Sequence, residues 1–141
     1  MTEDKFLAEL FKKLPTSSPQ VIVPPGDDCA VFLPTQGRQQ VIAADQLIEG
    51  IHYLKGTSAK LCGRKLLARN LSDIAAMGAK PEYAILTCKL SEEYDEKWLM
   101  DFHQGLLELA AEFDVQLIGG DLARGPGPSN FSLTITGSVE Q

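Results

Sequence analysis

The order of helical and strand patterns constrains the fold of this chain more than any other feature. Apolar residues recur at three- and four-residue steps over residues 58–78 and 95–113, which predicts two long helices. Residues 131–139 alternate strictly between apolar side chains and Ser or Thr, as expected for a strand with one buried face. Similar local patterns predict a helix at 3–14 and strands at 20–23, 29–33, 40–44, 84–90 and 116–118. This order predicts an α+β fold in which two main helices cover one face of a mixed sheet.

The other face of such a sheet also needs an environment. The Ser and Thr side of the last strand can lie against water, and a partner subunit is the alternative. With 141 residues the chain is long enough for one ordinary domain with a single core. We therefore treat residues 1–141 as a single domain.

The charge and the cysteines of the chain restrict its partners and its compartment. The formal net charge of −6 leaves no diffuse basic surface for nucleic acid or anionic lipid. No apolar run approaches the roughly 20 residues of a membrane span, and the N-terminus lacks a signal-peptide pattern. Cys29, Cys62 and Cys88 are odd in number and widely spaced, which favours reduced thiols in a cytoplasmic protein.

Four aspartates lie in contexts that suit a metal site. Asp28 follows Gly26 and a first Asp, Asp45 ends a predicted strand, Asp73 lies near the end of the second helix, and Asp121 follows two glycines. Carboxylates from separate elements that converge at one rim suit Mg²⁺, which also keeps waters and substrate phosphates as ligands. The two glycines before Asp121 would let a phosphate oxygen approach the backbone N–H groups.

Each of these positions also has a plain structural explanation. Adjacent acids and Gly-Gly-Asp both occur in ordinary turns. Asp73 lies against the negative end of its helix dipole, and Arg64 or Arg69 on the same helix can compensate it. His52 alone is more simply explained as a packed or exposed histidine. The chain contains no Walker motif and no glycine-rich loop of the Rossmann kind.

Taken together, four blocks resemble the N-terminal half of the thiamine-monophosphate kinases. The blocks are residues 26–31, 45–52, 70–79 and 117–126, in the order and spacing of that family. The resemblance implies a phosphotransferase that uses ATP to convert thiamine monophosphate into thiamine diphosphate. It places the chain in the superfamily that includes aminoimidazole-ribonucleotide synthetase and selenophosphate synthetase. It also implies a homodimer whose sheets form a shared barrel, with ATP and several Mg²⁺ in the resulting cleft.

The same resemblance assigns roles to six residues by match of motif. The implied Mg²⁺ ligands are Asp28, Asp45, Asp73 and Asp121, the implied nucleotide contacts are Gly120 and Asp121, and His52 would lie by the substrate. No catalytic residue is assigned, because an acceptor phosphate needs no general base. Transfer would rest on positioning and on neutralisation of charge by the metal ions.

The chain departs from the family pattern at three places. Ala43 and Ala44 stand where the family often has hydroxyl residues, so a metal ligand there would have to be a backbone carbonyl. A Leu-Ala pair at 122–123 replaces a common Thr-Thr. The chain also stops at Gln141, where the family continues into a second domain. We therefore expect an N-terminal ATP- and Mg²⁺-binding, dimerising domain that is inactive alone.

Two other functions remain open from the sequence. One is another ATP-dependent kinase or synthetase of the same superfamily, although the Glu-Gly-Ile-His setting of His52 favours the thiamine branch. The other is a dimerisation or metal-binding module without catalysis. Such a module would dimerise through its sheet and bind no nucleotide, even with Mg²⁺ present.

Overall fold

The computed structural model describes residues 2–141, and its elements follow the predicted order. The helices are α1 (Glu3–Lys13), α2 (Ala59–Ala76) and α3 (Glu96–Phe113). The strands are β1 (Val21–Val23), β2 (Val31–Phe32), β3 (Arg38–Ile48), β4 (Lys80–Ser91), β5 (Gln116–Gly125) and β6 (Asn130–Glu140). None of the helices in this described part is long and apolar enough to cross a membrane.

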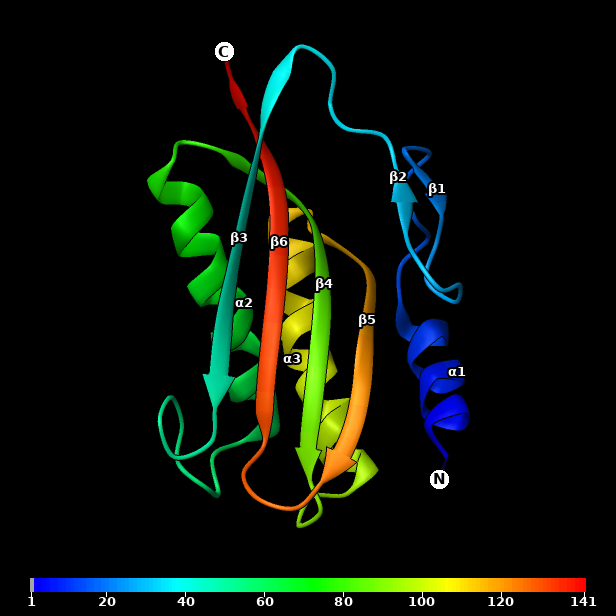
Figure 1. Ribbon diagram of the computed structural model, residues 1–141, viewed down its shortest axis with the longest axis vertical. Helices are drawn as coiled ribbons and strands as arrows, with labels where there is room; N and C mark the ends of the chain where they lie inside the picture. The colour runs from blue at the N-terminus through cyan, green and yellow to red at the C-terminus, as the bar shows by residue number, and fades with distance from the viewer. Residues whose placement is uncertain (1) are drawn as a thin grey trace.

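Four of the strands form one sheet in the order β3-β6-β4-β5, shown in Figure 1. Strand β6 is antiparallel to both of its neighbours, whereas β4 and β5 are parallel and are connected through α3. Strands β1 and β2 form a separate antiparallel pair beside β5. Consequently β3 and β5, which carry Asp45 and Asp121, lie at opposite edges of the main sheet.

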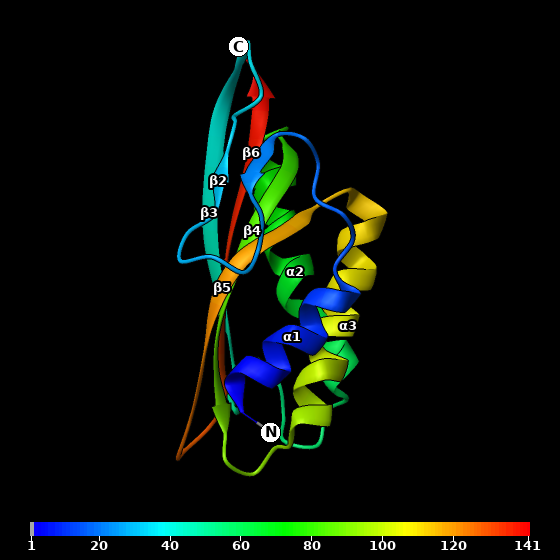
Figure 2. The same ribbon diagram turned by 90° about the vertical axis from the view of Figure 1, so that its right-hand side faces the viewer.

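Both long helices cover the same face of the sheet, as predicted. Figure 2 shows the sheet from its edge, with α2 and α3 on one side and none of the described helices over the other. Helix α1 lies on the helical side and contacts α3 through Phe6 and His103, whose ring centroids are 5.6 Å apart. The predicted α+β class with a mixed sheet is therefore confirmed.

The core lies between the sheet and these helices. Phe131, Leu133 and Ile135 of β6 have no exposed surface, as their alternation with Ser and Thr predicted. The ring of Phe102 in α3 stacks on Phe131 at a centroid distance of 4.2 Å. Helices α2 and α3 approach so closely that a Cβ on Gly63 would lie 1.9 Å from the Phe102 carbonyl oxygen. This packing fixes α2, and every side chain on it, against the sheet.

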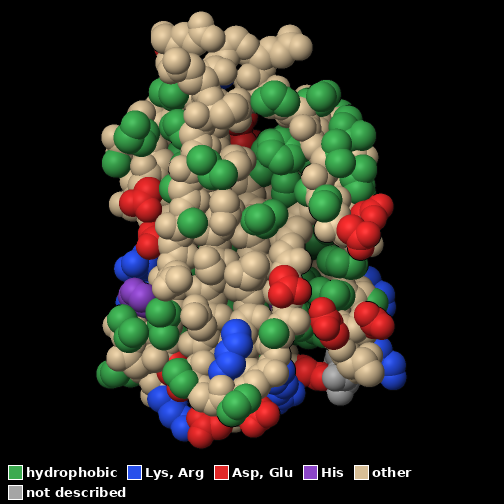
Figure 3. All heavy atoms as spheres, in the orientation of Figure 1, with side chains coloured by type: hydrophobic (Ala, Val, Ile, Leu, Met, Phe, Trp, Pro, Cys, Tyr) green, Lys and Arg blue, Asp and Glu red, His purple; other side chains and the backbone are tan. Residues whose placement is uncertain are grey.

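The face without helices is mostly polar, with a few exposed apolar side chains. Figure 3 shows mainly tan atoms over the strands with scattered hydrophobic side chains among them, while hydrophobic side chains gather at the upper right, over the β1–β2 pair. Ile42 on β3 is 72% exposed and Ile85 on β4 is 41% exposed. Ile42 pairs with Thr136 of β6 and Ile85 pairs with Thr134, so both lie on the same face as these threonines.

Two strands extend further than the sequence suggested. Strand β3 does not end on Asp45 but continues to Ile48, because β6 pairs with it along all eleven residues. Asp45 therefore lies inside the strand, opposite Leu133. The Gly-Gly-Asp segment likewise lies within β5, where its residues pair with β4. In both cases pairing with another strand, which the sequence alone does not show, extends the strand beyond its local pattern.

Candidate functional site

A cavity of about 760 Å³ lies at the β5 edge of the sheet. Asp28, Gly120 and Asp121 all line it, so the structure brings three of the predicted site residues together. The walls come from α1, residues 25–30, β2, β4, α3 and β5, and much of their surface is apolar. The apolar side chains of this wall include Phe6, Leu7, Leu10, Phe11, Phe32 and Leu117. An apolar wall beside a few polar groups is typical of small-molecule sites.

The carboxylates of this cavity are exposed and available to a cation. The backbone N–H of Asp28 donates to Asp27 Oδ1 at 2.8 Å, a contact that stabilises the turn before β2. Asp121 lies on β5 beside Thr87 of β4, and its side chain is exposed. Within residues 2–141, neither Asp28 nor Asp121 forms an ion pair with a basic side chain. Exposed carboxylate oxygens of this kind are suitable ligands for Mg²⁺.

The two glycines before Asp121 have different structural roles. A Cβ at Gly120 would lie 1.9 Å from the Leu86 carbonyl oxygen, so the close approach of β5 to β4 requires glycine there. A Cβ at Gly119 would meet only Ile85 Cγ2, at an ordinary 3.5 Å. The packing of the sheet therefore explains Gly120, whereas Gly119 is not required by the fold.

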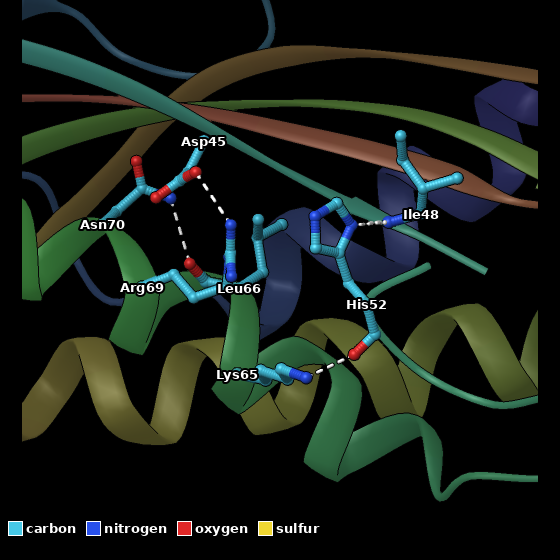
Figure 4. A network of polar contacts seen from close by, with 7 residues as sticks. All are labelled: Asp45, Ile48, His52, Lys65, Leu66, Arg69 and Asn70. Carbon is cyan, nitrogen blue, oxygen red and sulfur yellow. Dashed lines mark hydrogen bonds and ion pairs between the residues drawn. The ribbon is translucent and has the colours of Figure 1, made fainter. Parts of the chain in front are cut away.

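A second polar cluster lies on the other side of the chain, between β3 and α2. Asp45 points towards the helices, and Arg69 Nη2 donates to its Oδ1 at 3.1 Å, as Figure 4 shows. The two side chains are 24% and 36% exposed. In the same cluster, the Nδ2 of fully buried Asn70 donates to the Leu66 carbonyl oxygen at 3.0 Å. Asp45 therefore already has a positively charged partner within its own chain.

Asp73 lacks the partner that the sequence interpretation offered it. Arg69 is bound to Asp45, and Arg64 pairs with Glu112 of α3 at 3.6 Å. In the described part of the chain, Asp73 takes part in no ion pair and its side chain is exposed. The expected compensation of Asp73 within α2 was wrong, because both arginines find acidic partners on other elements.

His52 lies in the loop after β3, with one ring nitrogen engaged. The backbone N–H of Ile48 donates to His52 Nδ1 at 2.8 Å, and Lys65 Nζ donates to the His52 carbonyl oxygen. Because Nδ1 accepts this bond, the neutral ring carries its proton on Nε2. The ring is thus held in one orientation, and within residues 2–141 its Nε2–H donates to no other group.

The four predicted metal ligands do not meet within one chain. Asp28 and Asp121 lie at the β5 edge, whereas Asp45 and Asp73 belong to the β3–α2 side, about 14 Å away if three inter-strand spacings are counted. Asp45 pairs with Leu133 of β6, whereas Asp121 pairs with Thr87 of β4, which in turn pairs with Ser132 of β6. Ser132 and Leu133 are consecutive residues of one strand, so Asp45 and Asp121 point to opposite faces of the sheet. In residues 2–141, no group of three or more His, Cys, Asp or Glu side chains is placed to hold one metal ion. Within one chain the strand order therefore separates the carboxylates into two groups, and their meeting at a single rim stays a prediction.

Sequence reasoning missed two contributors to these clusters. Arg69 was treated as a partner for Asp73 and not for Asp45. His103 of α3 lines the cavity, with Nδ1 2.8 Å from the Leu99 carbonyl oxygen, and burial lowers its pKa. Neither role has a local signal, since Arg69 lies on a charged helix face and His103 lies within the apolar stripe of its helix.

The sequence model of one protein family matches most of this chain. The family is described as AIR synthase related protein, N-terminal domain, and the match covers residues 26–139. The chain belongs to this family. The predicted superfamily is thereby confirmed.

Individual members are similar over nearly the whole chain. The thiamine-monophosphate kinase of Escherichia coli K12 is 39% identical over 137 residues, which cover 97% of this chain and 41% of the relative. The crystal structure of thiamine-monophosphate kinase from Stenotrophomonas maltophilia K279a matches with 38% identity and a TM-score of 0.79, covering 97% of this chain and 41% of that one. These findings confirm the resemblance on which the sequence analysis rested.

A more distant structure shares the fold. AaThiL complexed with AMPPCP and TMP is 22% identical with a TM-score of 0.72, covering 77% of this chain and 35% of that one. Across these comparisons, the present chain spans about two fifths of the length of the relatives that it matches.

Proposed function

We propose that this chain is the ATP- and Mg²⁺-binding domain of a kinase that phosphorylates thiamine monophosphate, giving thiamine diphosphate and ADP. The observation that carries the proposal is the identity of 39% with a thiamine-monophosphate kinase along almost the entire chain. The cavity at the β5 edge supports it, since an apolar wall beside carboxylates that form no ion pair within residues 2–141 suits a nucleotide whose phosphates carry cations. An acidic protein needs such cations, because its own charge of −6 repels polyphosphates.

The predicted metal ligands fit Mg²⁺ to different degrees. Asp28 and Asp121 offer exposed oxygen ligands at the cavity, and Asp73 offers another on the β3–α2 side. Asp45 does not fit a metal as it stands, because Arg69 is bound to it. When bound, Mg²⁺ would neutralise phosphate charge and so allow two anionic reactants to approach. Gly120 contributes to the nucleotide site through the close β4–β5 approach that brings Asp121 to the cavity.

His52 is proposed to donate from Nε2 to thiamine monophosphate. The Ile48 N–H holds its ring, so the orientation is set before the substrate arrives. His52 and the cavity lie on opposite sides of one chain, so a single copy does not bring both groups to one substrate pair.

A homodimer through the open sheet face would resolve this separation. Two four-stranded sheets that close into one barrel bring the edges of one copy beside the edges of the other. Residues of the β3–α2 side of one copy could then complete the cavity of its partner. Exposed Ile42 and Ile85 supply apolar surface for such a contact.

The three cysteines without disulfide partners are consistent with a cytoplasmic protein.

Calorimetric titration with a non-hydrolysable ATP analogue tests the nucleotide site. We expect binding that requires Mg²⁺ and that Asp121→Asn abolishes. The matched control is Asp101→Asn, because Asp101 is a carboxylate on α3 that pairs with Lys97 and does not line the cavity. Binding that is independent of Mg²⁺, or unaffected by Asp121→Asn, would contradict the proposed site.

A chimera tests the reaction itself. The chain replaces the matching N-terminal part of the Escherichia coli kinase, and chromatography measures conversion of thiamine monophosphate to thiamine diphosphate. We expect product from the chimera, none from its Asp121→Asn variant, and none from the 141-residue chain alone.

The Arg69–Asp45 pair favours one alternative, a module without catalysis, since it covers a predicted metal ligand. A folded chimera without product, together with a chain that binds no nucleotide, would support that module. A chimera that phosphorylates a different acceptor would support another kinase of the superfamily.

A further inference from the structure

We propose that Arg69 occupies the position at Asp45 that the family resemblance gives to a Mg²⁺ ion, so that this chain takes up no metal there. The inference rests on the proposed function, because it concerns one of the ligands of the same site. Its structural basis is the ion pair between Arg69 Nη2 and Asp45 Oδ1, 3.1 Å apart.

The surroundings hold this guanidinium in place. Arg69 projects from α2, and α2 is locked against α3 by the backbone contact at Gly63. Arg69 Nε is buried without a hydrogen-bond partner in the described part of the chain, so the inner end of the guanidinium lies inside the protein and not in solvent. Figure 4 shows the side chain reaching from α2 to the carboxylate on β3. A metal ion at Asp45 would therefore have to displace a packed side chain.

The neighbouring residues offer a metal little in exchange. Ala43 and Ala44, which precede Asp45 on β3, have no side-chain oxygen. Asn70 uses Nδ2 to bind the Leu66 carbonyl oxygen, which leaves its buried Oδ1 without a hydrogen-bond partner among the described residues. A divalent cation would also meet the positive charge of Arg69 itself, and like charges at such a distance disfavour binding. Charge and sterics both favour the guanidinium over a metal while Arg69 is in place.

The function of the pair then follows from its charge. A fixed guanidinium neutralises Asp45 at all times and does not depend on the metal concentration, because arginine stays protonated. The domain would need one divalent cation fewer than the resemblance implies, with the remaining cations at the exposed carboxylates.

Mn²⁺, used as a paramagnetic substitute for Mg²⁺, provides the test. Bound Mn²⁺ is counted by electron paramagnetic resonance, with Mn²⁺ alone and with Mn²⁺ plus a non-hydrolysable ATP analogue. The variant Arg69→Met keeps an unbranched apolar stem in place of the inner part of the arginine side chain and removes the charged guanidinium. We expect this variant to bind one more equivalent of Mn²⁺ than the unchanged protein. The affinity for Mn²⁺ at Asp45 should rise on the order of tenfold. The double variant Arg69→Met/Asp45→Asn should lose that gain, and Asp45→Asn alone should leave the stoichiometry unchanged.

The opposite results would overturn the inference. If Asp45→Asn alone removes an equivalent of Mn²⁺, Asp45 is a metal ligand despite Arg69. If Arg69→Met gains nothing, the guanidinium is not what keeps metal away. Cooperative thermal unfolding confirms that the variants fold, and Arg69→Gln replaces Arg69→Met if the latter does not.

The proposed function fails separately, since it requires nucleotide-dependent Mn²⁺ binding that Asp121→Asn abolishes. If nucleotide-dependent binding is absent, the titration with Mn²⁺ alone still shows whether Asp45 binds a metal ion.

Discussion

The two polar regions of this chain differ in how far each is already satisfied by its own protein. At the β5 edge, Asp28 and Asp121 are exposed, line a cavity, and form no ion pair within residues 2–141. On the β3–α2 side, Asp45 is bound by Arg69, and the ring of His52 is held by a backbone N–H. The first region has unused ligand capacity, and the second is largely occupied by internal contacts.

This difference shows why the same residue type need not have the same role at motif positions. An exposed aspartate without a partner loses little on binding a cation, whereas a paired and partly buried aspartate must first give up its partner. The motif assigns all four aspartates to one task, but the contacts separate them. Experiments that treat equivalent residues of the two regions in the same way can therefore break or sharpen the contrast.

The largest effect is expected at Gly120 of the β5 edge. Gly120→Ala would place a Cβ 1.9 Å from the Leu86 carbonyl oxygen, so β5 would have to move away from β4. We expect a loss of about 3 kcal/mol in the free energy of unfolding, measured by urea denaturation, because backbone atoms cannot yield as a side chain can.

Gly119→Ala is the matched control for this experiment. Its Cβ would make only an ordinary contact with Ile85 Cγ2 at 3.5 Å, so stability should change by less than about 1 kcal/mol. Equal losses for both variants would show that glycine is needed here for backbone flexibility and not for the close approach of the strands.

The fold was predictable from the sequence where the signal was local. The periodicity of residues 58–78 and 95–113 located α2 and α3 within one or two residues, and strict alternation located β6. The strand order was not predictable, because a ladder between β3 and β6 joins residues about ninety positions apart in the chain. Pairing of β3 with β6, and of β5 with β4, likewise places Asp45 and Asp121, expected at strand ends, inside longer strands.

The site was predictable residue by residue but not as an arrangement. The motif identified Asp28 and Asp121, which do line one cavity. The apolar wall that α1 contributes was not recognised, since residues 3–14 were predicted only as a helix. Arg69 shows the limit most clearly: spacing of four residues suggested Asp73 as its partner, and packing of α2 against β3 selected Asp45 instead.

A second prediction compares Asp45 and Asp121 directly. Asp45→Ala leaves the partly buried guanidinium of Arg69 without its anion, so the free energy of unfolding should fall by about 1–2 kcal/mol. Asp121→Ala removes an exposed carboxylate without an ion pair among the described residues, so stability should change by less than about 0.5 kcal/mol. Thermal and urea unfolding measure both.

The nucleotide-binding effects of these two variants should run the other way. Asp121→Ala should abolish Mg²⁺-dependent binding of the ATP analogue, and Asp45→Ala should largely preserve it. A destabilised Asp121→Ala variant with intact nucleotide binding would reverse the assignment of the two regions.

The third prediction concerns the histidines, His103 at the cavity and His52 beyond β3. Burial lowers the pKa of His103, although its bond to the Leu99 carbonyl oxygen acts in the opposite direction. The unfolded chain therefore binds this proton first as the pH falls. Stability is fully present above the ordinary pKa near 6.5 and declines below it, by at most about 1.4 kcal/mol per pH unit.

Urea denaturation between pH 7.5 and about 5.5 measures this slope, before most carboxylates titrate. His103→Gln should reduce the slope. His52→Asn, whose side-chain oxygen can replace Nδ1 as the acceptor for the Ile48 N–H, should retain the His103 contribution. A slope that disappears with His52→Asn and persists with His103→Gln would place the titrating group on the wrong side of the molecule.

The smallest effect is a change in the reactivity of thiols. Cys29 is exposed at the cavity, whereas burial raises the pKa of Cys62 on α2 to about 11 and also raises that of Cys88. At pH 8 only about one Cys62 thiol in a thousand is ionised, and the thiolate is the reactive form. We expect one rapidly modified thiol per chain in a spectrophotometric thiol assay, and none in Cys29→Ser.

If the nucleotide occupies the cavity, Mg²⁺ with the ATP analogue should slow modification of Cys29 a few-fold. The slow modification of the buried Cys62 and Cys88 should not change. Protection of the slow phase instead would mean that the ligand acts by stabilising the whole fold, and the cavity would no longer be the region that distinguishes the two sides.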